Sequence, residues 1–173
     1  STAMNLSGSC AIVGIGETDY VRGAKESSAD LILRASAQAI ADAGLKPSDI
    51  DGILPSANFL SSEEIAANLG VPNMTYSVSV LMGGASPTAS LQSAAMAIAC
   101  GVAKTVLVTF GWDGYSAFRR ERRVGPQRQQ MQMPFAEVSR NYYAPYGVRT
   151  AAQWYSFYLT RYVQTYGVQP EDA

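Results

Sequence analysis

The sequence predicts an α/β fold in which a mostly parallel sheet carries helices on both of its faces. The prediction rests first on residues 74–114, which have the pattern of a strand, a tight glycine turn, a helix and a second strand. It rests also on two helices and two short strands that alternate along the chain before this stretch. Strands that alternate with helices imply a mostly parallel sheet covered by those helices.

A short apolar strand is expected at residues 10–15, and a loop follows it. Gly14 and Gly16 invite comparison with a dinucleotide-binding loop, but Asp19 stands where the third glycine of that motif belongs. No helix follows at once, as that motif also requires. We therefore interpret the two glycines as part of a loop that leaves the end of a strand.

Two helices are predicted by the residues that begin and end them. Ser27 and Asp30 form a variant of the capping box that opens the first helix, and Gly44 ends it. Ser61 and Glu64 open the second helix in the same way. The apolar positions of the first helix recur at helical spacing and are Ile32, Ala35, Ala39, Ile40 and Ala43.

Three further strands and one buried helix are expected in the middle of the chain. Residues 52–54 form a short strand, and residues 75–80 are rich in the β-branched and aromatic side chains that favour strands. Residues 88–100 are small or apolar on all faces, which is typical of a buried helix, and Gly101 ends it. Residues 105–110 form the near-continuous apolar run of a strand covered on both faces.

A glycine turn precedes the helix that we expect to be buried. Gly83 and Gly84 allow the backbone to turn sharply and to approach another molecule closely. Ser86 is expected to cap the helix, and Pro87 suits its first turn. The first backbone N–H groups of the helix then make this turn a candidate site for a carbonyl oxygen or an anion.

The length, net charge and composition of the sequence exclude several classes of protein. The chain has 173 residues, enough for one core, and its net charge of −1 shows no electrostatic footprint for nucleic acid. Its apolar runs are too short to span a membrane, and nothing resembles a signal peptide. Ser1, Thr2 and Ala3 precede Met4. We therefore set residues 1–4 apart as a cloning remnant, with Met4 as the expected native start.

Histidine is missing from the sequence, which limits the chemistry of the chain. Ser-His-Asp and Cys-His machinery cannot be built from these residues alone. Two cysteines, Cys10 and Cys100, do not make a disulfide framework, so a reducing cytoplasm is the simplest compartment. Two cysteines without histidine also argue against a structural zinc site, and no metal is expected.

An irregular insertion is expected at residues 111–149, and it is rich in arginine. The arginines of residues 118–134 are Arg119, Arg120, Arg122, Arg123 and Arg128. One interpretation is a solvated or inter-subunit surface loop. The other is that Arg119 and Arg120 contact an anionic substrate, such as the phosphates of coenzyme A. Glu121 and the near-neutral total argue against nucleic-acid binding.

The last full helix is expected at residues 150–166 and ends at Gly167. One of its faces is aromatic and apolar and comprises Tyr155, Tyr158, Leu159, Tyr162, Val163 and Tyr166. Such a face is expected to pack in a core or an interface. Pro170, Glu171 and Asp172 have the pattern of another helix start, which suggests a longer protein.

Taken together, these motifs resemble the N-terminal half of the thiolase superfamily. The matching stretches are AIVGIGETDY (residues 11–20), ADAGLKPSDIDGIL (41–54), GGASPTASLQSAAMAIACGVAKTVLV (83–108) and RYVQTYGVQPED (161–172). The branch they resemble most is that of the sterol-carrier-type thiolases, lipid-transfer proteins and steroid side-chain aldolases. The resemblance implies that residues 5–173 are one half of a thiolase-like αβαβα fold, with the C-terminal half absent.

One position departs from the thiolase pattern. Thiolases place a nucleophilic cysteine at the N-terminus of the buried helix, where the helix dipole helps to hold a thiolate. Counting back from Gly101 with the spacing of the family, that position falls on Gly84. Cysteine-based acyl-enzyme chemistry is therefore not available at this site, and the chain has no confirmed catalytic residue.

The resemblance implies a function on a coenzyme A thioester. It implies retro-aldol cleavage of a carbon–carbon bond in a 3-hydroxyacyl-CoA, often steroid-derived, or acyl transfer, with catalytic side chains mainly from the absent half. Met82, Gly83, Gly84 and Ser86 are the expected substrate-binding residues. No cofactor is implied beyond the coenzyme A of the substrate, and a homodimer with a small OB-fold partner is expected.

The residues around Ser86 do not support a role for it as a nucleophile. The sequence Gly84-Ala85-Ser86-Pro87-Thr88 lacks the final glycine of the G-x-S-x-G pattern, and no histidine can activate the serine. We therefore retain the helix cap as its role. Two alternatives to an enzyme fragment stay open, namely a non-catalytic lipid or acyl-CoA binding module and a scaffold that dimerises through residues 75–80.

Overall fold

The computed structural model describes residues 7–56, 60–112, 114–115, 136–148, 150–169 and 171. The chain divides into two compact units, Ser1–Gln127 and Arg128–Ala173.

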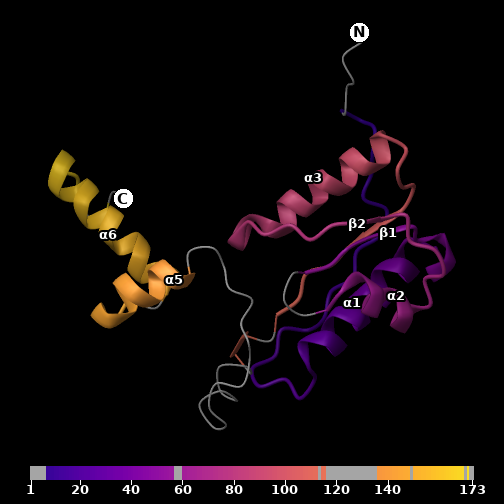
Figure 1. Cartoon of the computed structure of the whole chain (residues 1–173), viewed down its shortest axis with the longest axis horizontal. Helices are drawn as coiled ribbons and strands as arrows, with labels where there is room; N and C mark the ends of the chain where they lie inside the picture. The colour runs from indigo at the N-terminus through magenta and orange to yellow at the C-terminus, as the bar shows by residue number, and fades with distance from the viewer. Residues whose placement is uncertain are drawn as a thin grey trace. The chain divides into compact units, whose positions relative to one another are not determined.

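A parallel sheet of three strands lies at the centre of the first unit, in the order β2-β1-β3 (Figure 1). The strands are β1 (Gly52–Leu54), β2 (Tyr76–Ser77) and β3 (Val106–Val108). Gly52 of β1 pairs with Tyr76 on one side and with Val106 on the other. The predicted α/β class with a parallel sheet is therefore confirmed.

Helices cover both faces of this sheet, as the sequence predicts. The helices α1 (Ser28–Asp42) and α2 (Ser62–Leu69) lie on one side, and α3 (Ser86–Ala99) lies on the other (Figure 1). Short 3₁₀ turns, η1 (Pro47–Asp49) and η2 (Gly83–Ala85), precede β1 and α3 respectively. The sheet is thus the middle layer of three.

The core lies between the sheet and the pair α1 and α2. It consists of Ile32, Ile40, Ile50, Ile53, Ile65, Val71 and Leu107, which are buried and form one cluster. Fully burying such a side chain stabilises a fold by about 1.5–3 kcal/mol. This cluster fixes α1, α2 and the strands as one body.

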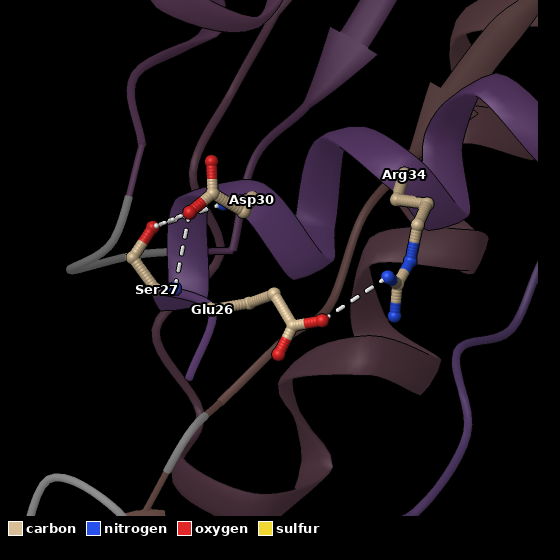
Figure 2. A network of polar contacts seen from close by, with 4 residues as sticks. All are labelled: Glu26, Ser27, Asp30 and Arg34. Atoms are coloured by element: carbon tan, nitrogen blue, oxygen red, sulfur yellow. Dashed lines mark hydrogen bonds and ion pairs between the residues drawn. The ribbon is translucent and has the colours of Figure 1, made fainter. Parts of the chain in front are cut away.

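The N-terminus of α1 is closed by the predicted capping box (Figure 2). The hydroxyl of Ser27 accepts the backbone N–H of Asp30 at 3.1 Å, and the Asp30 carboxylate accepts the backbone N–H of Ser27 at 3.1 Å. The Ser27 hydroxyl also donates to this carboxylate at 2.7 Å, and these bonds hold the pKa of Asp30 below its ordinary value. The helix ends at Ala43, and Gly44 follows with φ of 67°.

One exposed ion pair lies beside this capping box. Arg34 of α1 reaches back toward the residue before the cap, and its guanidinium lies 3.3 Å from the Glu26 carboxylate (Figure 2). An exposed pair of this kind contributes about 0–1 kcal/mol, because water and salt screen it. The ion pair therefore contributes little to the stability of the whole fold.

The second predicted capping box is also confirmed. Ser61 accepts the backbone N–H of Glu64 at 3.1 Å, and the Glu64 carboxylate accepts the backbone N–H of Ser61 at 2.8 Å. Gly70 ends α2 with a left-handed φ of 78°. These residues place α2 where Ile65 enters the core.

The expected strand at residues 10–15 does not form. This segment pairs with no strand in the described part of the chain, and it runs along α1 instead. A helix side chain satisfies one of its backbone groups, because Ile15 N–H donates to the Asp42 carboxylate at 2.9 Å. Ile12 and Val13 remain 71% and 63% exposed, so the apolar pattern here is not buried by the described residues.

Gly14 and Gly16 lie in irregular backbone, as their interpretation as loop residues predicts, and they also have a packing role. A Cβ atom at Gly14 would overlap the backbone oxygen of Ala39, and one at Gly16 would overlap that of Ala35. The two glycines therefore let the segment lie directly on α1. This contact explains the glycine spacing without a dinucleotide.

The helix α3 is not buried on all faces. Its buried residues Ser90, Ala94 and Ala97 form one stripe, whereas Leu91 and Met96 are 45% and 44% exposed. The described sheet covers only one side of the helix, so the prediction of burial all round is wrong for the described structure. The end of α3 is as predicted, with Gly101 at φ of 73°.

The strands are shorter than the apolar runs that predict them. The run at residues 75–80 pairs only at Tyr76 and Ser77, and the run at 105–110 only over Val106–Val108. The central strand β1 ends before Pro55, which lacks the N–H that a ladder needs. The short central strand β1 thus limits how many residues of β2 and β3 can pair with it.

The second unit is helical. It contains α5 (Ala136–Val138), a π-helical turn η3 (Ser139–Tyr143), a 3₁₀ turn η4 (Ala144–Tyr146) and α6 (Ala151–Tyr166). Thr150 caps α6 through Gln153, and Gly167 ends it at φ of 66°, so this helix is confirmed as predicted. The rings of Tyr143 and Trp154 lie 3.9 Å apart and join η3 to α6.

The aromatic face of α6 is exposed within this structure. Its exposed large side chains are Tyr155, Tyr158, Leu159, Tyr162 and Tyr166. Among the described residues of the second unit no core covers this face, and its packing in an interface stays a prediction. No helix in the described part of the chain is both long enough and apolar enough to cross a membrane.

Candidate functional site

The turn between β2 and α3 places the two predicted glycines side by side, but they differ in conformation. Gly83 has a left-handed φ of 58°, which an L-residue adopts only at a cost. Gly84 does not lie in that region, and a Cβ atom built on it would meet nothing within 4 Å. The backbone therefore requires glycine at Gly83, whereas the missing side chain of Gly84 leaves open space.

Ser86 closes this turn instead of capping the helix, which corrects the prediction. Its hydroxyl donates to the backbone oxygen of Gly83 at 2.8 Å and accepts the N–H of Met82 at 2.9 Å. Because the glycines form a 3₁₀ turn, Ser86 is already helical, and Ala85 is the N-cap residue without a side-chain bond. The hydroxyl proton is thus engaged with a carbonyl, which does not favour a nucleophile.

The turn offers backbone donors. Among the described residues, no protein acceptor binds the N–H groups of Gly83 and Gly84, and the neighbouring Met82 is exposed. Unpaired N–H groups at the start of a helix attract partial negative charge. The turn therefore leaves two backbone N–H groups that a hydrogen-bond acceptor could reach.

The carboxyl ends of β2 and β3 lie at one edge of the sheet, because the strands are parallel. The glycine turn follows β2, and Phe110 follows β3. Since β1 lies between them, the two strands are about 10 Å apart. Open α/β sheets bind ligands outside the carboxyl ends of their strands, so both segments are candidates for contact with a ligand.

A cavity of about 350 Å³ lies beyond the end of β3, and we refer to it as the aromatic cavity. Its walls come from residues 16–21, from Ala24, from Leu31 and Ala35 of α1, and from residues 110–112, 114 and 115. Two glycines let these segments pack closely against α1. Gly16 lies against the Ala35 backbone, and Gly111 lies against the side chain of Ile32, where a Cβ atom would overlap it.

The charge of the aromatic cavity is negative. Glu17 and Asp19 line it, and no lysine, arginine or histidine does so among the described residues. The Tyr20 hydroxyl donates to the Glu17 carboxylate, which raises the pKa of Tyr20 and keeps its proton in place. At the rim, the guanidinium of Arg22 lies 5.9 Å from the centre of the Tyr115 ring.

Sequence reasoning finds the glycine turn but misses the aromatic cavity. The structure brings Met82, Gly83, Gly84 and Ser86 together in one turn, whereas Arg119 and Arg120 lie outside the described residues. The signal that could have indicated the cavity is the pair of segments GETDY and FGWDGY. Each follows an apolar run and combines aromatic side chains with carboxylates.

Similarity to known proteins covers almost the whole chain. No family model matches it. It is 35% identical over 168 residues to the "Steroid side-chain-cleaving aldolase" of Thermomonospora curvata, covering 96% of this chain and 42% of that protein. It is 33% identical over 174 residues to the "17-hydroxy-3-oxo-4-pregnene-20-carboxyl-CoA lyase" of Mycobacterium tuberculosis, covering 96% and 43%. The chain thus spans less than half the length of these relatives.

A solved structure extends the similarity to the fold. The "Ltp2-ChsH2(DUF35) aldolase" superposes with a TM-score of 0.77 and 32% sequence identity, over 94% of this chain and 40% of that chain. This match agrees with the resemblance of the sequence motifs. Sequence and fold together show that this chain is related to a protein named as a steroid side-chain-cleaving aldolase and to one named as a CoA lyase.

Proposed function

We propose that this chain is the N-terminal part of an enzyme that cleaves a carbon–carbon bond beside a coenzyme A thioester. The substrate we propose is a 3-hydroxyacyl-CoA whose acyl group is a steroid side chain. The observation that carries the proposal is the similarity over 96% of the chain to two proteins named as an aldolase and a CoA lyase. Because the chain spans less than half of each relative, the activity belongs to the longer protein.

The proposed reaction is a retro-aldol cleavage. A base removes the proton of the hydroxyl on the β-carbon, and that carbon–oxygen bond becomes the carbonyl of a ketone. The bond between the α- and β-carbons breaks, and its electron pair moves to the α-carbon as the enolate of the thioester. A proton then converts the enolate to the shortened acyl-CoA, so no oxidant or covalent enzyme intermediate is required.

The glycine turn supports this chemistry over that of a thiolase. With Gly84 at the position of the family nucleophile, the site has no thiol with which to form an acyl-enzyme. The open space at Gly84 admits the thioester, and the unpaired N–H groups of Gly83 and Gly84 can stabilise negative charge on the enolate oxygen. The hydroxyl base is proposed to come from the rest of the protein.

The proposed partners follow from the same relatives. We propose a homodimer, with a small OB-fold protein as a further partner, and the joined name of the "Ltp2-ChsH2(DUF35) aldolase" supports a second component. Coenzyme A is part of the substrate, and Arg119 and Arg120 are proposed to contact its phosphates. The compartment we propose is the cytoplasm.

The proposal is tested by incubating the full-length protein with the coenzyme A thioester of a hydroxylated steroid side chain. The expected products are a steroid ketone and a shortened acyl-CoA, each identified by mass spectrometry. Saturable binding of the thioester without cleavage, also with the partner protein added, would instead favour a non-catalytic acyl-CoA binding module.

A further inference from the structure

We propose that the aromatic cavity receives the fused-ring part of the substrate, while the thioester lies at the glycine turn. This assignment rests on the proposed function and adds to it the place where the ring system is bound. The described lining of the cavity comes from the first unit, namely from residues 16–21, Ala24, the helix α1, and residues 110–112, 114 and 115.

The volume of the cavity restricts what it can hold. At about 350 Å³ it lies at the small end of ligand pockets, which range from about 300 to 1,000 Å³. A ring system together with coenzyme A would require far more space. The described hollow therefore has room for one part of such a substrate.

The charge of the lining decides which part enters. Coenzyme A carries several phosphate charges, and the two carboxylates of Glu17 and Asp19 would repel them at short range. Among the described lining residues there is no cationic side chain to neutralise a phosphate. The neutral end of the substrate is therefore the part that fits.

The walls match a flat apolar ring system that carries a hydroxyl group. The aromatic side chains that line the cavity, those of Tyr20, Phe110, Trp112 and Tyr115, are 92%, 61%, 69% and 46% exposed, so they form an open aromatic surface. Val21 and Leu31 add aliphatic surface, and large flat surfaces of this kind gain affinity by excluding water. The carboxylates can accept a hydrogen bond from a ring hydroxyl, which would orient the ring.

The cavity and the glycine turn follow two strands whose carboxyl ends lie at the same edge of the sheet. The cavity includes residues that follow β3, and the glycine turn follows β2 after five further residues, 78–82. Open α/β sheets bind ligands outside the carboxyl ends of their strands, so one substrate can contact both segments.

The test compares two substrates in the full-length protein, a steroid thioester and a short 3-hydroxyacyl-CoA without rings. We expect Trp112→Ala to raise KM for the steroid thioester at least about tenfold, with kcat/KM for the short thioester within about twofold, because only one of them enters the cavity. Ala24→Leu, which fills the cavity without removing a wall, should act in the same direction. Lys46→Ala, at an exposed residue of the first unit that does not line the cavity, is the control and should change neither value.

Direct binding separates this inference from the proposed function. The free ring ketone, without coenzyme A, is titrated by equilibrium dialysis, with tetramethylammonium as a cationic probe because aromatic and acidic sites also attract cations. If the wild type cleaves neither thioester, the proposed function fails, yet ring-ketone binding that Trp112→Ala abolishes would still support the cavity. If Trp112→Ala affects both substrates equally, or neither, or if only tetramethylammonium binds, the ring assignment is overturned.

Discussion

At the scale of single residues, the two glycines before α3 have separate reasons to be glycine. Gly83 is required by its left-handed backbone, whereas Gly84 is not constrained by its conformation or by its neighbours. The lack of a side chain at Gly84 therefore leaves the space in front of the turn open. This distinction follows from the structure, because both residues look alike in the sequence.

Alanine substitution at the two positions should separate stability from activity. Gly83→Ala is expected to lower the free energy of unfolding by about 1–2 kcal/mol, because an L-residue must adopt the left-handed conformation. Gly84→Ala should leave it within about 1 kcal/mol of the wild type but reduce kcat/KM for the thioester substrate. Urea unfolding and steady-state kinetics measure the two effects, and equal destabilisation by both variants would contradict this account.

The role of Ser86 could not be predicted from its neighbours in the sequence. Serine before a proline and an apolar helix is typical of an N-cap, and the local pattern gives no reason to shift it by one position. The glycines add a 3₁₀ turn, which moves Ser86 into the helix and directs its hydroxyl to Gly83 and Met82. The correct role thus depends on backbone geometry that only the folded turn defines.

At the scale of elements, the helices that carry their own boundary residues are predicted well. The starts of α1, α2 and α6 are marked by Ser27, Ser61 and Thr150, and each of these residues forms a capping box in the structure. Capping is a local interaction, so the sequence contains the information it needs. Strands depend on distant partners, which is why residues 10–15 are apolar like a strand yet remain unpaired among the described residues.

The capping box of α1 should contribute measurably to stability. Ser27→Ala is expected to lower the free energy of unfolding by about 1 kcal/mol, because the N–H of Asp30 loses its acceptor. Thermal and urea denaturation of the purified chain measure the change. Ser48→Ala, at an exposed serine of η1 that takes no part in the bond between the Lys46 N–H and the Asp49 carboxylate, is the control and should have little effect. A loss in Ser27→Ala no greater than in the control would contradict the assigned role.

The same capping box predicts a dependence of stability on pH. The pKa of Asp30 is lower in the folded chain than its ordinary value of 3.8, so the folded state holds its proton less tightly than the unfolded state. The stabilisation is therefore complete above about pH 4 to 5 and is lost as the pH falls through the lowered folded pKa. Melting temperatures measured from pH 6 to pH 2 should fall less steeply for Asp30→Asn than for the wild type, and parallel curves would contradict the prediction.

At the scale of the whole molecule, the described structure leaves apolar surface uncovered. Ile12, Val13, Leu91 and Met96 are exposed in the first unit, and the aromatic face of α6 is exposed in the second. Exposed apolar surface of this extent indicates contact with other protein. A single sequence can show that a face is apolar, but the molecule that covers it is not encoded in the local pattern. The burial of α3 could therefore not be predicted correctly.

The edge of the sheet at β2 gives a test of the proposed homodimer. β2 is an outer strand of the described sheet, and Val78 follows it with a partly exposed side chain. If two copies pair along this edge, Val78→Asp should reduce the molecular mass in solution from that of a dimer to that of a monomer, because it buries a charge in the interface. Light scattering measures the mass, and Ala37→Asp, at an exposed residue of α1, is the control. An unchanged mass in Val78→Asp would exclude pairing through this edge.

The measurement that tests the central claim most directly is a single-turnover reaction of the full-length protein with the steroid thioester. The quenched mixture is divided for product analysis and for the mass of the intact protein. We predict equal amounts of ketone and shortened acyl-CoA, with the protein mass unchanged, because Gly84 provides no nucleophile. Failure to form the ketone would contradict carbon–carbon cleavage, and a protein carrying the acyl group would contradict a reaction without a covalent enzyme intermediate.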